Sequence, residues 1–140
     1  MTANYSAPAS SISKIRALGI PLVVTEDVRK AFTHAEMLAQ QGHVILDDCN
    51  DTAIAEGHGT LALEFIQDCP ALTDVFVAVG GGAMLAGVAT TLKAIKPEIR
   101  IWGVETDGAN SMDRALRARV PVEIEVSSII STLGVPLSEK

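Results

Sequence analysis

Aromatic residues are scarce in this chain of 140 residues, which has one Trp, one Tyr and three Phe. A core without large rings must be built from Ala, Val, Ile and Leu, a composition that suits helices packed on a buried parallel sheet. No stretch approaches the ~18–20 consecutive apolar residues of a membrane span, and the first residues lack the pattern of a signal peptide. We therefore expect no membrane partner and a cytoplasmic location.

Basic residues are also few. The 11 Lys and Arg are outnumbered by 17 Asp and Glu, which gives a net charge of −6. Nucleic-acid surfaces need clustered Lys and Arg for phosphate contacts, so nucleic acid is not an expected partner. The two cysteines, Cys49 and Cys69, lack the spacing of a zinc site or a disulfide framework, and we expect free thiols. The length suits one domain with a single core.

Short β-branched runs alternate with longer amphipathic runs along the chain. This alternation predicts an α/β fold with a mostly parallel sheet and flanking helices. The expected strands are residues 22–25, 44–47, 75–79, 99–104 and 122–126, and the expected helices are residues 9–18, 28–41, 53–67, 84–95 and 111–118. Residues 1–7 are expected to be a frayed start. Since a doubly wound sheet normally opens with a strand, we expect the chain to begin partway through its architecture.

Three consecutive glycines, Gly80, Gly81 and Gly82, join the expected strand 75–79 to the next helix. Glycine permits positive φ and close backbone approach, and the N–H groups at a helix start can converge on an anion. A dinucleotide fingerprint fails because its third glycine position is Leu85, and no Walker Gly-Lys-Ser/Thr follows. We predict a site for a single phosphate, formed by Gly80, Gly81, Gly82, Ala83 and Met84. The alternative is that the glycines only form a tight turn.

Three motifs occur in a fixed order. They are Leu46-Asp47-Asp48 with the segment 54–64, Val77-Ala78-Val79-Gly80-Gly81-Gly82 with Leu85-Ala86-Gly87, and Lys96-Pro97-Glu98-Ile99 with Gly103-Val104-Glu105. From residue 7 to 134 the chain resembles the fold type II pyridoxal-phosphate enzymes, in particular the serine/threonine dehydratases and serine racemases. His58 stands where the family usually has glutamine, and Ala83 where many members have a fourth glycine. Both changes keep the backbone N–H donors.

The resemblance implies a partial tryptophan-synthase-β-like architecture. Residues 1–47 would match the tail of the family's small domain, and residues 48–140 part of its large, cofactor-phosphate-binding domain. Gly80–Met84 would hold the phosphate of pyridoxal 5′-phosphate. The resemblance further implies a Mg²⁺ or Ca²⁺ site formed by Glu105, the Ala109 carbonyl and Ser111, since these groups offer hard oxygen ligands. Two alternatives are that Asp107 and Asn110 cap the next helix, or that Glu105 holds a ribose hydroxyl.

The family's Schiff-base lysine motif, Ser-Phe-Lys-x-Arg-Gly, has no counterpart here. Ser13-Lys14-Ile15-Arg16 imitates it but lacks the phenylalanine, and no asparagine loop follows, so we assign no catalytic residue. One hypothesis is a fragment of a serine/threonine dehydratase, an ammonia-lyase that is inactive alone. The other is a stand-alone module for binding a phosphorylated metabolite or for oligomerisation. Expected partners are an amino acid or phosphorylated ligand and, because unpaired strand edges associate, a second copy or a complementary chain.

Overall fold

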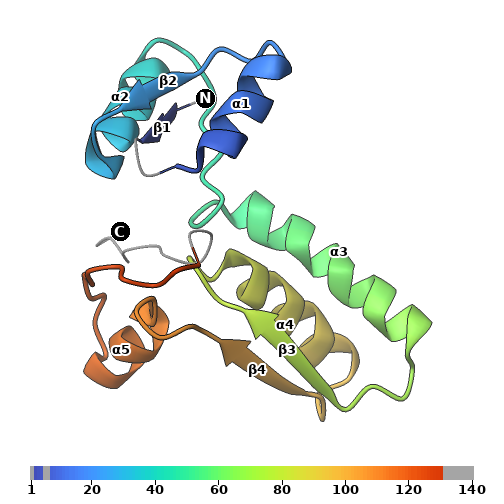
Figure 1. The fold of residues 1–140 in the computed structure, drawn as a ribbon. Helices are drawn as coiled ribbons and strands as arrows, with labels where there is room; N and C mark the ends of the chain where they lie inside the picture. The colour runs from blue at the N-terminus through green and yellow to red at the C-terminus, as the bar shows by residue number, and fades with distance from the viewer. Residues whose placement is uncertain (1, 5–6, 131–140) are drawn as a thin grey trace. The chain divides into compact units, whose positions relative to one another are not determined.

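The computed structural model describes residues 2–4 and 7–130, and the chain divides into two compact units, Met1–Ile45 and Leu46–Lys140 (Figure 1). The units divide after Ile45, close to the predicted boundary at residue 47. That the two parts match the family's small and large domains stays a prediction. No helix in the described ranges is both long enough and apolar enough to cross a bilayer. The cytoplasmic location and the exclusion of nucleic acid stay predictions.

The first unit contains a short parallel ribbon and two helices. Strand β1 (Thr2–Asn4) pairs with β2 (Val23–Thr25), and the helices are α1 (Ala9–Ala17) and α2 (Val28–Gln40). Helix α2 begins after Asp27, whose carboxylate accepts the Lys30 N–H at 2.7 Å. The expectation of a frayed start with no strand before the first helix was wrong, because residues 2–4 form β1.

The second unit is built on two parallel strands, β3 (Asp74–Ala78) and β4 (Arg100–Val104). The helices are α3 (Thr52–Asp68), α4 (Ala83–Ile95) and α5 (Ser111–Ala118). Side chains of α3 and α4 pack on one face of the sheet, and the buried cluster is Ala62, Val75, Val77, Val88, Leu92 and Ile99. The α/β prediction is thus confirmed, and all five helices and the strands 22–25, 75–79 and 99–104 agree with the structure to within one residue at each end.

Helices α3 and α4 run side by side in Figure 1, and two glycines allow the close approach. A Cβ on Gly87 would overlap the Ala55 carbonyl oxygen and lie 2.9 Å from the Gly59 nitrogen. A Cβ on Gly59 would lie 2.6 Å from Thr91 Oγ1. Since any larger side chain would separate the helices, glycine at both positions keeps the starts of α3 and α4 close together.

Two predicted strands were wrong, because neither segment 44–47 nor segment 122–126 forms a strand in the described structure. The first runs into a turn made by Asp47, whose carboxylate accepts the N–H groups of Cys49 and Asn50 at 3.0 Å each. After the second segment, Ser127 N–H donates to the Gly108 carbonyl at 2.9 Å. Local hydrogen bonds to a turn thus replace pairing along a sheet edge.

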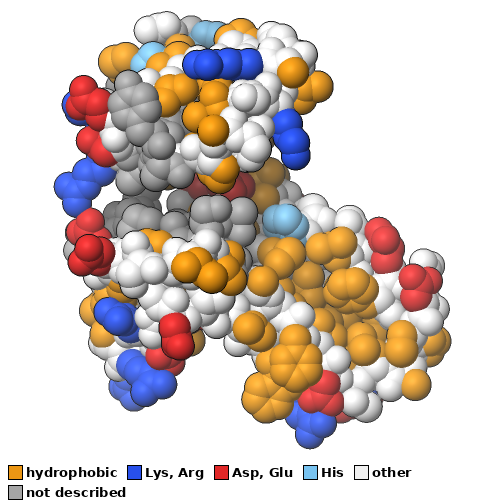
Figure 2. Space-filling model, in the orientation of Figure 1, with side chains coloured by type: hydrophobic (Ala, Val, Ile, Leu, Met, Phe, Trp, Pro, Cys, Tyr) orange, Lys and Arg blue, Asp and Glu red, His pale blue; other side chains and the backbone are white. Residues whose placement is uncertain are grey.

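The other face of the β3–β4 sheet is exposed. Phe76 and Trp102 are paired in the ladder and stack with ring centroids 6.1 Å apart, yet Phe76 is 71% and Trp102 48% exposed. Asp74 accepts Arg100 at 2.7 Å and the Trp102 indole N–H at 2.9 Å, and these bonds, Arg100 first, hold the pKa of Asp74 well below its usual range. Figure 2 shows hydrophobic side chains gathered on the face of the second unit over β3 and α3.

Candidate functional site

The glycine loop leads from β3 into the start of α4. Gly82 immediately precedes α4 with φ +97°, a left-handed conformation that glycine adopts without steric cost. The first N–H groups of any α-helix have no intrahelical acceptor, and Gly82 has no side chain that could accept them. The start of α4 therefore presents backbone donors and the positive end of the helix dipole without a side-chain cap.

Neighbouring side chains lie close against this loop. A Cβ on Gly81 would lie 2.5 Å from Cys49 Cβ and 3.2 Å from Cys49 Cα. A Cβ on Gly82 would lie 3.0 Å from Met112 Cε. The distance of 2.5 Å is far too short for two carbon atoms, so the structure requires glycine at position 81 for close approach. Position 82 favours glycine because of its positive φ.

A cavity of about 370 Å³ opens beside the glycine loop, and three helix starts line it. Asp51 and Thr52 contribute from the start of α3, residues 81–83 from the start of α4, and Met112 from the start of α5. Each helix start carries the positive end of a dipole. An anion in the cavity would therefore face the positive ends of three helix dipoles.

Two of these helix starts carry a carboxylate cap. Asp51 accepts the Ala53 N–H at 2.9 Å. Glu105, directly after β4, accepts the N–H groups of Met112 and Asp113 at 2.9 and 2.8 Å, one on each carboxylate oxygen. The start of α4 differs from these two, because its capping residue Gly82 has no side chain that could accept an N–H group.

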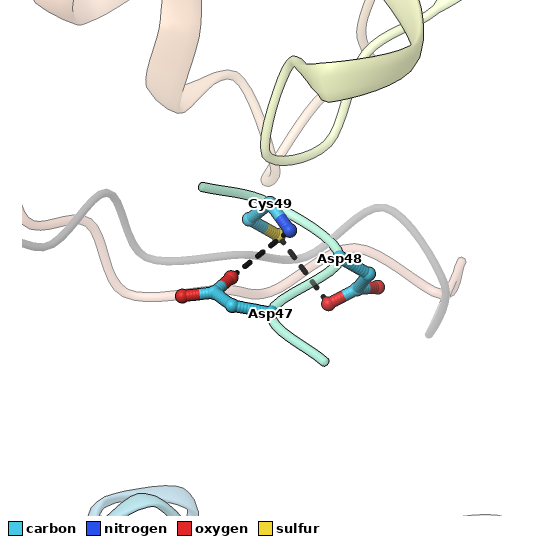
Figure 3. Close-up of side chains that lie close together, drawn as sticks. All are labelled: Asp47, Asp48 and Cys49. Atoms are coloured by element: carbon cyan, nitrogen blue, oxygen red, sulfur yellow. Dashed lines mark hydrogen bonds between the residues drawn. The ribbon is translucent and has the colours of Figure 1, made fainter. Parts of the chain in front are cut away.

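The loop before α3 carries Asp47, Asp48 and Cys49 close together (Figure 3), and Cys49 packs against Gly81. Besides two backbone N–H groups, Asp47 accepts Asn50 Nδ2 at 3.0 Å, and the Cys49 thiol donates to Asp48 at 3.8 Å. Burial first, and then the charges of Asp48 and Asp47, raise the pKa of the Cys49 thiol, while a hydrogen bond from the Gly81 backbone lowers it in part. The thiol is therefore mostly neutral at pH 7.

Asp47, Asp48 and Cys49 are also the one set of three ligand-type side chains that lie within reach of one another in the described ranges. Both Asp47 oxygens already accept N–H groups that shape the loop. Sequence reasoning assigned no role to Cys49 beyond a free thiol. Its contact with Gly81 depends on two segments that are distant in the sequence, and no local pattern could have found it.

The predicted cation ligands lie around the connection from β4 to α5. Ala109 and Ser111 are each 1% exposed, and Glu105 binds the start of α5 with both oxygens. The alternative caps are not seen, since Asn110 makes no side-chain cap bond and Glu105 takes that role. A Mg²⁺ or Ca²⁺ site at Glu105, Ala109 and Ser111 stays a prediction.

Comparison with known proteins gives a consistent result. A family model described as pyridoxal-phosphate dependent enzyme matches residues 2–140. An L-threonine ammonia-lyase of Thermotoga maritima is 34% identical over 113 residues, which cover 79% of this chain and 28% of that protein. A phenylserine dehydratase of Ralstonia pickettii is 29% identical over 137 residues, which cover 96% of this chain and 42% of that protein.

Solved structures show the same fold. The processed form of threonine deaminase isoform 2 from Solanum lycopersicum matches 99% of this chain with a TM-score of 0.86 and 30% identity. Maize serine racemase matches 98% of the chain with a TM-score of 0.84 and 26% identity. The matches cover 41% and 43% of those chains, so this chain spans less than half the length of these relatives.

Proposed function

Since the chain belongs to the pyridoxal-phosphate dependent enzyme family, and its fold is that of the fold type II members, we propose that its second unit holds the cofactor's phosphate in a dehydratase of the serine/threonine class. The observation that carries this proposal is the start of α4, where glycines replace a side-chain cap. The substrate class is drawn from relatives that are threonine ammonia-lyases and a phenylserine dehydratase.

The residues at the cavity suit a phosphate group. The absence of Cβ atoms at Gly81 and Gly82 lets an anion approach the backbone, and the N–H groups of Gly81 to Met84 are available as donors. Asp51 and Glu105 already accept N–H groups at the starts of α3 and α5, which leaves α4 as the preferred place for the phosphate. The volume of about 370 Å³ lies in the usual range for small-molecule sites.

The chain's own contribution is binding and orientation. Bound pyridoxal phosphate supplies an electron sink for the amino-acid carbon that loses its proton. The dipole of α4 and the loop N–H groups hold the phosphate and so fix where the ring lies. No described residue is assigned to move that proton, because no lysine matches the family's motif. We therefore propose that the isolated chain binds the cofactor without performing dehydration.

We also propose that a further polypeptide covers the exposed face of the β3–β4 sheet. Phe76 and Trp102 form a stacked apolar pair there, and large exposed apolar patches mark interaction surfaces. The occupant is a second copy of the chain or a complementary segment that completes the fold. Measuring the mass in solution by light scattering tests this, and a Phe76→Ser, Trp102→Ser variant should shift the protein toward monomer.

The phosphate site is tested by placing a negative charge beside it without touching the glycines. Ala86 is exposed, lies one turn into α4 and lines the cavity, so Ala86→Glu puts a carboxylate next to the phosphate. Thr90→Glu adds the same charge one turn further along the exposed face of α4 and serves as the control. Thermal unfolding is followed by circular dichroism with pyridoxal phosphate or inorganic phosphate present.

We expect wild type and Thr90→Glu to be stabilised by about 2.7 kcal/mol at a ligand concentration of 100 times Kd. Ala86→Glu should bind at least tenfold more weakly, since a like charge at close range opposes the anion. If neither ligand stabilises the wild type, or if both variants bind equally well, the proposed site is wrong.

A further inference from the structure

The Met112 side chain packs against the glycine loop from the start of α5. A Cβ on Gly82 would lie 3.0 Å from Met112 Cε, so this methyl group lies against the residue that directly precedes α4. Met112 also lines the cavity together with residues 81–83. One side chain of α5 therefore meets the loop at the proposed phosphate site.

The position of Met112 is fixed by Glu105, the residue directly after β4. Its two carboxylate oxygens accept the N–H groups of Met112 and Asp113 at 2.9 and 2.8 Å. In the connecting turn, the Ala109 N–H donates to the Thr106 carbonyl at 3.0 Å. These bonds tie the first turn of α5 to the end of β4, so Met112 reaches the glycine loop from a fixed backbone.

Contact with Met112 matters because the loop consists of glycines. Glycine loses more conformational freedom on ordering than any other residue, and a ligand that needs the loop in one conformation loses binding free energy to this ordering. A side chain packed on Gly82 restricts the loop before the ligand arrives, which makes binding tighter. Met112 is suitably placed for this, because it contacts one of the residues proposed to hold the phosphate.

We infer that Met112 and Glu105 are positioning residues of the phosphate site. Met112 restricts the loop at Gly82, and Glu105 holds Met112 in place through the backbone of α5. The inference rests on the proposed function and assigns neither side chain a direct bond to the phosphate. The carboxylate that caps one helix thereby helps to shape the anion site at the start of another.

Substitutions at position 112 test the packing contact. Met112→Ala removes the group that lies against Gly82, so inorganic phosphate should bind about three- to tenfold more weakly. Met112→Val also withdraws the terminal methyl group and should weaken binding in the same direction. Met112→Leu keeps an apolar side chain of similar volume and should bind within about twofold of the wild type. Leu116→Ala, at an exposed side chain one turn further along α5, is the control and should leave the affinity unchanged.

A double-mutant cycle tests whether Glu105 acts through Met112. Glu105→Ala removes a negative charge and frees two N–H groups, and both changes favour an anion equally in the wild-type and Met112→Ala backgrounds, so they cancel in the cycle. The ratio of Kd values, Glu105→Ala over its parent, should be at least about threefold larger in the wild-type background. Asp27→Ala removes the carboxylate cap of α2 in the first unit and should leave Kd unchanged.

Affinities for inorganic phosphate and pyridoxal phosphate are measured by isothermal titration calorimetry on variants that circular dichroism shows to be folded. Without ligand, the Gly82 amide resonance should shift in Met112→Ala and in Glu105→Ala, but not in Leu116→Ala. Weaker binding by Met112→Ala or Met112→Val, restored in Met112→Leu, together with a non-additive cycle, supports the inference. If these truncations bind as well as the wild type, or if the cycle is additive, the inference is wrong while the phosphate site stands. If the wild type binds neither ligand, the proposed function fails together with this inference.

Discussion

The starts of α4 and α5 occupy equivalent places, since each helix follows one of two paired parallel strands. They differ in what meets their first N–H groups. At α5 the carboxylate of Glu105 accepts from Met112 and Asp113, whereas at α4 Gly82 provides no side chain. The first N–H groups of α5 are thus bonded to a carboxylate of the protein, whereas Gly82 offers no such acceptor to those of α4. We propose that the uncapped start of α4 is for this reason the one left free to bind an anion.

Removing the carboxylate at α5 should give the largest change in stability. In Glu105→Ala two N–H groups lose a charged acceptor, and we expect the free energy of unfolding to fall by about 2 kcal/mol. Glu105→Gln keeps one acceptor and should lose roughly half as much. Urea unfolding measures both. Glu98→Ala, at an exposed glutamate before β4, is the control, and an equal stability of the Glu98 and Glu105 variants would contradict the capping role.

Adding a side chain at position 82 tests whether the backbone conformation at the start of α4 requires glycine. Gly82 has φ +97°, so Gly82→Ala should cost about 1–2 kcal/mol of stability and force Met112 to shift. Gly57 is the matched control, because it lies inside α3 with open space where a Cβ would be. Gly57→Ala should instead stabilise by roughly 0.5–1 kcal/mol. Two Gly→Ala changes with the same sign would show that backbone conformation does not explain Gly82.

The sequence alone predicted most of the helices and strands of this fold. Periodicity located the five helices and three strands well, because each depends on a local pattern of apolar residues. The apolar run 44–47 has the same local pattern but forms no strand. This segment forms no strand because the Asp47 carboxylate accepts the N–H groups of Cys49 and Asn50, and because no neighbouring strand pairs with it in the described structure.

The candidate site shows the same limit. The three glycines were recognisable because glycine at a strand-to-helix junction has a direct backbone consequence. Glu105 was considered as a cation or ribose ligand, while its contact with α5 spans seven and eight residues and follows from the path of the connecting turn. Cys49 meets Gly81 through the packing of α3 on α4, which depends on Gly59 and Gly87 rather than on any motif near the cysteine.

The smallest expected effect concerns the thiol of Cys49, which lies beside the start of α4. Burial and the carboxylates of Asp48 and Asp47 raise the pKa of Cys49 in the folded state. The unfolded chain then releases the thiol proton at a lower pH than the folded one. Stability is therefore fully present below the ordinary thiol pKa of about 8.5 and declines as the pH rises from there toward the folded-state value.

Chemical unfolding at pH 7.5 and 9.5 checks this pH dependence. The wild type should lose slightly more stability between the two values than Cys49→Ala, whereas Cys69→Ala should follow the wild type. The difference is small because the thiol is only partly buried, and solvent screens the nearby carboxylates. An identical pH dependence in Cys49→Ala and wild type would mean that the folded structure does not shift the pKa of the Cys49 thiol.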